Sequence, residues 1–296
     1  SFYAMLFAIP LAILGAIYTA YFMTAKMRNI VKPSIEIMAA LPTVILGFLA
    51  GLWLAPLIEQ HLAGVFLSFI AIPTSFLLAS AVAENLPASL RKYCREGWEA
   101  ALLLPVVCFG IWAALALSQP IEIAFFDGSL PQWLSQELGI SYDQRNSLVV
   151  GMAIGFAVIP TIFSISEDAI FGVPRHLTSG SLALGATPWQ TVIGVVILTA
   201  SPGIFSAVMI GLGRAVGETM IVLMATGNTP IMDVNIFQGF RALSANIAVE
   251  MPESEVNSTH FRVLFLAALV LFLVTFIVNT VAEIVRQRLR VKYSNL

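Results

Sequence analysis

Long uncharged apolar runs dominate this sequence of 296 residues. A helix needs about 18 or more apolar residues to cross the ~30 Å hydrocarbon core of a bilayer, and seven runs here reach that length. Only 11% of the residues are charged, against about 25% in a typical soluble domain. The sequence therefore predicts an all-α, polytopic transmembrane helical bundle. Its predicted spans are Phe2–Thr24, Ile37–Ile58, Leu62–Ala83, Ala100–Gln119, Asn146–Ser166, Pro202–Thr226 and Val263–Ala282.

The placement of Lys and Arg predicts the orientation of these spans, because both residues gather in cytoplasmic loops. If Lys26 faces the cytoplasm, alternation of the spans puts eleven of the 15 Lys and Arg on that side. We therefore expect a cytoplasmic C-terminus and an external N-terminus. Because the first span begins at Phe2 without a leader, we also expect a missing upstream segment with at least one more helix, so that the sequence is a fragment of a longer chain. The eleven residues are Lys26, Arg28, Lys32, Arg91, Lys92, Arg95, Arg175, Arg286, Arg288, Arg290 and Lys292.

Only the sixth span carries charged residues, Arg214 and Glu218 in the sequence GLGRAVGET. If the helix begins at Pro202, Arg214 lies about 18 Å from its start, near the bilayer midplane. Glu218 follows four residues later and should share a helix face with Arg214. A charge at this depth costs several kcal/mol. The pair is either a structural ion pair between helices or an anion-attracting residue with its counter-ion, and the sequence leaves both open.

Several glycines are spaced for close helix packing. Small residues let two helix backbones approach, most clearly in G-x-x-x-G spacings. Packing is the simpler explanation for two such spacings, whereas the glycines near the two charges could also admit a ligand. The candidates are Gly211, Gly213 and Gly217 near the charges, and Gly47, Gly51, Gly151 and Gly155 elsewhere.

The segment from Glu167 to Thr199 predicts a cytoplasmic excursion of short helices. Thr187-Pro188 and Ser201-Pro202 each combine an N-cap residue with Pro at the first helical position, so two helices should begin there. The 14 residues between these starts are too few to cross the membrane. An apolar segment on the cytoplasmic side needs a surface that covers it, which makes it a candidate partner-binding element.

The sequence lacks the motifs of common enzymes. There is no G-x-x-x-x-G-K-[ST], so the chain has no P-loop of its own, and no H-E-x-x-H or G-x-S-x-G. His61, His176 and His260 are scattered. We expect a chain without catalytic residues, metal site or cofactor, and no nucleic-acid partner.

Five stretches resemble one family, the permease subunits of ABC importers, and most closely those of phosphate-specific (Pst-type) systems. They are LALGATPWQTV (182–192), SPGIFSAVMIGLGRAVGETMIVLMATG (201–227), EDAIFGVPRHL (167–177), IPLAILGAIYTAYF (9–22) and ALPTVILGFLAGL (40–52). The first is similar to the family's E-A-A-x-A-L-G-A-T loop, the second contains its G-R-A-x-G-E-T, and the third is similar to E-D-A-x-x-x-V-P-x-x-L. The chain departs from the loop pattern at Ser179, where Glu is usual, and at Leu198, where Pro is common.

The resemblance implies one transmembrane permease domain over residues 1–296, with the type I (MetI-like) importer core, in the bacterial inner membrane. Residues 62–119 have no counterpart in that core and would be an inserted helix pair. Residues 167–199 would be the coupling region. The expected partners are a second permease subunit, a dimer of ATPase subunits that uses ATP with Mg²⁺, a periplasmic phosphate-binding protein and membrane lipid.

The resemblance also assigns roles to residues. Arg214 would attract the anion, Glu218 would hold Arg214 in place and keep phosphate binding weak, and Thr219 would belong to the same pathway. Gly211, Gly213 and Gly217 would serve helix packing. The residues that meet the ATPase would be Leu182, Ala183, Leu184, Gly185, Ala186 and Thr187.

Three alternatives to a phosphate importer remain at this point. The first is a permease for another oxyanion, such as phosphonate, sulfate or molybdate, because an arginine does not discriminate among them. The second is a channel or carrier that works without an ATPase. The third is a membrane anchor in which Arg214 and Glu218 only hold helices together.

Overall fold

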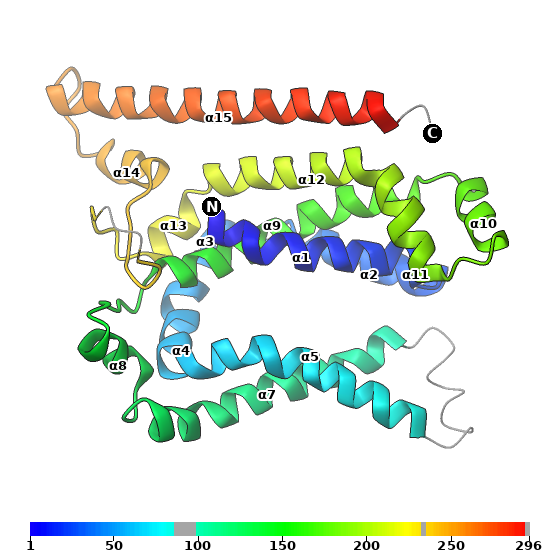
Figure 1. The fold of residues 1–296 in the computed structure, drawn as a ribbon. Coiled ribbons are helices and arrows are strands. Elements are labelled where there is room, and N and C mark those ends of the chain that lie inside the picture. Colours follow the sequence, from blue (N-terminus) through cyan, green and yellow to red (C-terminus); the bar gives the residue numbers. More distant parts are fainter. Residues whose placement is uncertain (86–98, 232–234, 294–296) are drawn as a thin grey trace. The chain divides into compact units, whose positions relative to one another are not determined.

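The computed structural model of the chain describes residues 1–85, 99–231 and 235–293, and every regular element in this part is helical (Figure 1). Seven of its helices are long and apolar enough to cross a membrane, and each overlaps one predicted span. The all-α, multi-span prediction is therefore confirmed. The helices are α1 (Phe2–Ile17), α2 (Ala25–Met38), α3 (Thr43–Leu49), α4 (Ala55–Gln60), α5 (Leu62–Asn85), α7 (Glu99–Phe125), α8 (Leu130–Glu137), α9 (Ser147–Phe171), α10 (Arg175–Ala183), α11 (Pro188–Thr191), α12 (Ile197–Gly217), α13 (Met220–Ala225), α14 (Leu243–Glu250) and α15 (Thr259–Tyr293), with π-helical turns η1 (Tyr18–Phe22), η2 (Ala50–Leu54) and η3 (Val192–Val196).

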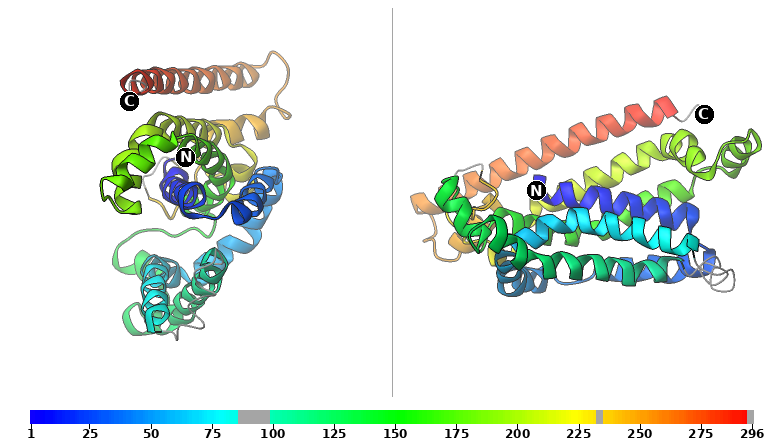
Figure 2. Two further views of the ribbon diagram at one scale, coloured as in Figure 1. Left: turned by 90° about the vertical axis from the view of Figure 1, so that its right-hand side faces the viewer. Right: turned by 60° about the horizontal axis from the view of Figure 1, so that its bottom comes forward.

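The described residues form two compact units. The first unit is drawn from residues 1–51, 147–231 and 239–293, and the second from residues 52–85, 99–146 and 235–238. In the first unit α9 is the most buried span; α1 and α12 both pack against it, and α15 packs against α12 (Figures 1 and 2). This unit carries all the predicted site residues.

Both G-x-x-x-G spacings of the first unit are close helix contacts, as predicted. A Cβ atom on Gly151 would lie 2.8 Å from Cβ of Tyr3, and one on Gly155 would lie 3.0 Å from the carbonyl oxygen of Ala4, both in α1. In the same way Gly47 and Gly51 let α3 and η2 approach α13. These distances are too short for any side chain, so the glycines are needed for packing and not for a ligand.

In the second unit, α5 and α7 form an antiparallel pair. A Cβ atom on Gly64 would lie 2.9 Å from Cβ of Ser118, whereas one on Gly110 would lie 2.9 Å from Oγ of Ser75, so the chain directions are opposite. Glu122 is 5% exposed and accepts a hydrogen bond from the backbone N–H of Ala63, at the start of α5. This pair contains residues 62–85 and 99–119 of the segment 62–119, whose status as an insertion stays a prediction.

The predicted helix start at Ser201-Pro202 is wrong. The chain is helical without interruption from Pro188 to Gly217, through α11, η3 and α12, and Pro202 lies inside α12. A proline within a helix leaves the carbonyl four residues earlier without its usual donor. Here the hydroxyl of Ser201 donates to that carbonyl, on Leu198, at 2.9 Å. Ser201 therefore compensates for the proline and is not an N-cap.

The other predicted start is confirmed. Thr187 caps α11 in a capping box with Gln190, in which Thr187 Oγ1 accepts from the Gln190 backbone N–H at 3.2 Å and Gln190 Oε1 accepts from the Thr187 N–H at 2.8 Å. The continuous helix of 30 residues is roughly 45 Å long at 1.5 Å per residue. It exceeds the ~30 Å hydrocarbon core, so part of it must lie beyond the core.

Gly211 sets the distance between α12 and α9, and this predicts a stability effect. A Cβ atom on Gly211 would lie 2.5 Å from Cγ1 of Ile162 and 3.0 Å from Cγ1 of Val158. We expect Gly211→Ala to lower the free energy of unfolding by roughly 1–3 kcal/mol through overpacking. Gly217→Ala is the matched control, because no heavy atom lies within 4 Å of its Cβ position. Thermal unfolding of the purified variants in detergent measures the difference, and equal melting temperatures would contradict this assignment.

Candidate functional site

Arg214 lies in the last turn of α12, at the end of the helix away from α10 and α11. The helix begins 14 residues earlier than the sequence suggested, so the depth counted from Pro202 loses its basis, and the position of Arg214 near the midplane stays a prediction. The Arg214 side chain is half-buried, and its Nη1 donates to Thr161 Oγ1 of α9 at 2.8 Å. Within the described residues no carboxylate pairs with this guanidinium.

The predicted ion pair between Arg214 and Glu218 is wrong. The helix ends at Gly217, and Glu218 has an extended backbone (φ −66°, ψ 123°), so the two side chains do not share a helix face. Instead, Glu218 Oε1 accepts from the backbone N–H groups of Met220 and Ile221, at 3.2 and 3.3 Å. A carboxylate at this place neutralises the unpaired N–H groups and the positive end of the dipole of α13. Glu218 thus starts a new helix, and the positive charge of Arg214 has no counter-ion in the described chain.

The three glycines near Arg214 have different surroundings. Gly211 packs against α9, as described above. A Cβ atom on Gly213 would lie 3.3 Å from Oδ1 of Asn279 in α15, while Gly217 is exposed and no heavy atom lies within 4 Å of its Cβ position. Gly211 and Gly213 therefore lie at helix contacts, as the packing prediction requires, whereas no described side chain or helix packs on the Cβ side of Gly217. Thr219 lies in the link between α12 and α13, and its hydroxyl donates to the Gly217 carbonyl at 3.2 Å.

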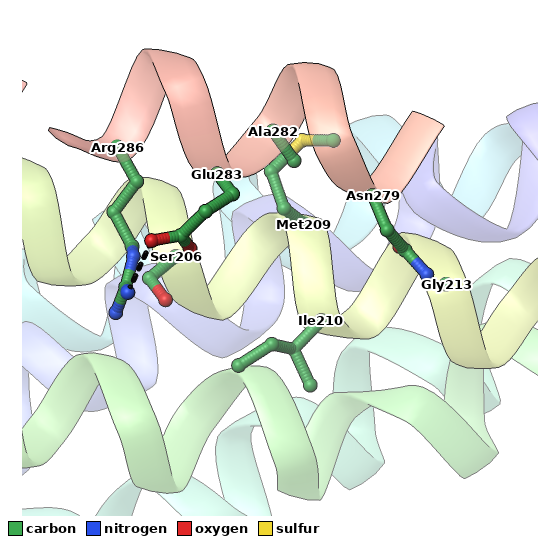
Figure 3. Close-up of a pocket in the computed structure, with 8 residues that line it drawn as sticks. All are labelled: Ser206, Met209, Ile210, Gly213, Asn279, Ala282, Glu283 and Arg286. Carbon is green, nitrogen blue, oxygen red and sulfur yellow. Dashed lines mark hydrogen bonds and ion pairs between the residues drawn. The ribbon is translucent and has the colours of Figure 1, made fainter. Parts of the chain in front are cut away.

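A groove of about 450 Å³ lies between α12 and α15 and has Gly213, the residue before Arg214, at one end (Figure 3). Its wall contains Gly213 at one end and an ion pair between Arg286 Nη2 and Glu283 Oε1, 2.7 Å apart, at the other. Asn279 and Ser206 add polar groups along its length. Polar side chains are costly against lipid, so this face of α15 is better suited to water or protein than to acyl chains.

The segment predicted to meet an ATPase forms an exposed corner between α10 and α11. Leu184 is 91% exposed, which is unusual for a leucine, and Leu182 is 43% exposed. Gly185 has φ +89°, a backbone conformation that side chains with a Cβ rarely adopt. Gly185 ends α10 with its N–H bonded to the Leu182 carbonyl, and Thr187 then caps α11. The corner presents Leu184 outward and is fixed at both sides by helix caps, with Ala183 exposed and Ala186 half-buried.

A charged cluster at the end of α9 was not predicted as a site. Glu167 is fully buried, and its carboxylate lies 2.5 Å from Arg28 Nε and 2.8 Å from Lys32 Nζ, both from α2. Lys32 also pairs with Asp168, and the Arg28 guanidinium lies over the ring of Phe171, 3.5 Å from its centroid. The available signal was the spacing of Arg28 and Lys32, which puts both on one helix face. The sequence does not reveal that this face meets α9.

The carboxylates keep Lys32 positively charged. Burial lowers the pKa of Lys32, but hydrogen bonds and attraction from Asp168 and Glu167 outweigh this effect and raise the pKa above its usual 10.5. A raised lysine pKa adds stability that is fully present below the unfolded-state pKa and is lost only as the pH rises through the folded-state pKa. The contribution of the Lys32 charge to stability therefore does not change with pH near neutrality.

Comparison with known families decides the class of this chain. A family described as "Binding-protein-dependent transport system inner membrane component" matches residues 8–291. The chain belongs to this family. It is therefore a multi-pass membrane permease, a transport subunit and not an enzyme. The family match also confirms the fold class that the resemblance implied.

Individual relatives agree with this assignment. The chain is 30% identical to the "Phosphate transport system permease protein PstC" of Mesorhizobium japonicum over 80% of its length and 73% of that protein. It is 32% identical to "Phosphate transport system permease protein PstC 1" of Mycobacterium tuberculosis over 77% of its length and 70% of that protein. It is 36% identical to the "Probable ABC transporter permease protein YqgH" of Bacillus subtilis, over 45% and 43% of the two chains. No solved structure matches the chain.

Proposed function

We propose that this chain is a permease subunit of an ATP-driven phosphate importer in the bacterial inner membrane, with a cytoplasmic C-terminus. The main support is the family match over residues 8–291, together with relatives named as phosphate transport permeases that align over about four-fifths of the chain. A second permease subunit, a dimer of ATPase subunits and a periplasmic phosphate-binding protein would complete the importer. The ATPase subunits would hydrolyse ATP with Mg²⁺.

Arg214 is the residue that we assign to the anion. Its guanidinium makes one hydrogen bond, to Thr161, and no ion pair within the described residues. A guanidinium has five N–H donors and matches two oxygens of a phosphate at once. An uncompensated positive charge in an apolar span is costly unless a ligand or partner supplies the negative charge. This favours an anion pathway over a membrane anchor held by an internal ion pair.

Glu218 and Thr219 would act on the same pathway through the backbone. They form the link between α12 and α13, and the carboxylate of Glu218 fixes the start of α13. A break in a span next to a charged residue is typical of the ion and substrate sites of transporters. In this proposal Glu218 sets the position of Arg214 by ending α12, and it does not act as its counter-ion.

The exposed corner from Leu182 to Thr187 would dock on an ATPase subunit. Leu184 would contribute most to the binding free energy, because burying a fully exposed leucine contributes about 1.5–3 kcal/mol. ATP binding would draw the two ATPase subunits together and move the corner. The spans attached to it would then open the pathway alternately to the two sides of the membrane.

Transport by the reconstituted complex tests this function. The chain, its second permease subunit and the ATPase are placed in liposomes. The phosphate-binding protein is added outside the liposomes, on the side that the periplasmic face of the complex occupies. We expect uptake of labelled phosphate that requires ATP and the binding protein. Uptake by this chain alone, without ATP, would favour a channel or carrier. Inhibition of phosphate uptake by phosphonate, sulfate or molybdate at a concentration similar to that of phosphate would favour a permease for another oxyanion.

A further inference from the structure

The last turn of α9, residues Glu167–Phe171, is here called the α9 base. It directly precedes α10, from which only Gly172, Val173 and Pro174 separate it. Any displacement of α10 therefore reaches the α9 base through a link of three residues. The helices that contact the α9 base determine which other helices move with it.

Helix α2 grips one side of the α9 base through charge. Arg28 contacts two of its residues, because Nε bonds to the buried carboxylate of Glu167 and the guanidinium face covers Phe171 one turn later. Lys32 bonds to Glu167 and to Asp168. Both cations lie at the C-terminal end of α9, where the helix dipole favours positive charge. No residue of α2 is buried, so hydrophobic packing contributes little to this contact.

Helix α12 packs against the other side of the α9 base. A Cβ atom on Gly203 of α12 would lie 2.4 Å from Cβ of Ala169, so the two backbones are as close as glycine permits. The hydroxyl groups of Ser181 and Thr191, 2.9 Å apart, connect α10 to α11. The α12 side is thus close backbone packing, whereas the α2 side depends on charged contacts, in which Glu167 is the one carboxylate that pairs with both Arg28 and Lys32.

We propose that Glu167 is a positioning residue for coupling: it passes the movement of α10 to α2, and through η1 to α1. This inference rests on the proposed function, because the movement originates in an ATPase partner. Helix α2 follows η1 after Met23 and Thr24, and it packs against α9 and η1. A charge-assisted hydrogen bond suits this task because it is stronger than a neutral one and fixes the geometry of its two partners, and the carboxylate of Glu167 that makes it is fully buried.

The test uses the complete importer in liposomes with Glu167→Gln, which keeps the side-chain shape and removes the charge. We expect basal ATP hydrolysis within about twofold of the unchanged importer, and a loss of roughly tenfold in both its stimulation by the loaded binding protein and the phosphate imported per ATP, as expected for residues that modulate coupling. Glu167→Asp keeps the charge and should restore both quantities to within about threefold. Lys26→Gln is the matched control, because Lys26 lies on the exposed face of α2 and should change neither.

Arg28→Lys keeps the proposal testable if Glu167→Gln does not assemble. Lysine retains the positive charge but has neither the Nε hydrogen bond nor the planar face over Phe171, so we expect an intermediate loss of about threefold in phosphate imported per ATP. Variants that lower only the melting temperature of the complex, with normal import per ATP, would overturn the positioning role and leave a structural one. An unchanged importer that takes up no phosphate with ATP would instead disprove the proposed function.

Discussion

Arg214→Ala is expected to lower ATP-dependent phosphate uptake at least about 100-fold in complexes that still assemble. The guanidinium can donate two charge-assisted hydrogen bonds to one phosphate, at about 1.5–3 kcal/mol each, and its charge has no carboxylate partner within the described residues. Alanine removes both bonds and the charge. The measurement is the initial rate of uptake by liposomes that contain equal amounts of complex.

Two further variants separate the charge of Arg214 from its shape. Arg214→Lys keeps the charge and loses the two-pronged geometry, so uptake should fall by about tenfold, the value of one such bond. Arg145→Gln is the control, because Arg145 is an exposed arginine outside the spans and should have no effect on the rate. Normal uptake by both Arg214→Ala and Arg214→Lys would remove this residue from the transport pathway.

Gly185→Val is expected to abolish most of the stimulation of the ATPase by the permease. At φ +89° a β-branched residue is strongly disfavoured, and a left-handed conformation costs at least about 1–2 kcal/mol even for simpler side chains. The corner would escape this strain by changing its backbone, which would turn Leu184 away from its partner. We expect a loss of at least about tenfold in stimulated hydrolysis, because the contact of one buried leucine is then missing.

Gly180→Ala provides the control for that substitution. Gly180 lies within α10, and no heavy atom lies within 4 Å of its Cβ position. Alanine there should strengthen α10 slightly and leave hydrolysis unchanged. Normal stimulation by the Gly185→Val complex would show that the corner does not contact the ATPase.

Sequence patterns predicted local structure correctly where a single short-range interaction determines it. The G-x-x-x-G pairs at Gly47 and Gly151 are close contacts, since only a residue without a side chain fits there. The N-cap at Thr187 was recognisable because Pro follows it at the first helical position. The same cap pattern failed at Ser201, because the pattern does not show whether the hydroxyl bonds forward to a free N–H or back to the carbonyl of Leu198.

Arg214 and Glu218 show a similar limit to what spacing in the sequence can predict. The spacing of Arg214 and Glu218 indicates an ion pair only if the helix continues between them, and it ends at Gly217. The Glu218 carboxylate then accepts hydrogen bonds from the backbone N–H groups at the start of α13 and not from Arg214, because these N–H groups lie within three residues of it. The sequence assigned Glu218 to Arg214, whereas the structure pairs the Arg214 guanidinium with Thr161 of α9; the role of Arg214 in transport stays a prediction.

Hydrophobic length and charge placement in the sequence by themselves determined that this chain is a helical membrane protein, because the bilayer demands long uncharged helices whatever their neighbours. The motifs near residues 167–192 and 201–227 were enough to indicate the family. Only the tertiary structure decided that Arg28 and Lys32 enclose the buried carboxylate of Glu167, 139 residues away from Arg28 in the chain. The physical reason is that an ion pair depends on distance in space, which no local pattern in the chain encodes.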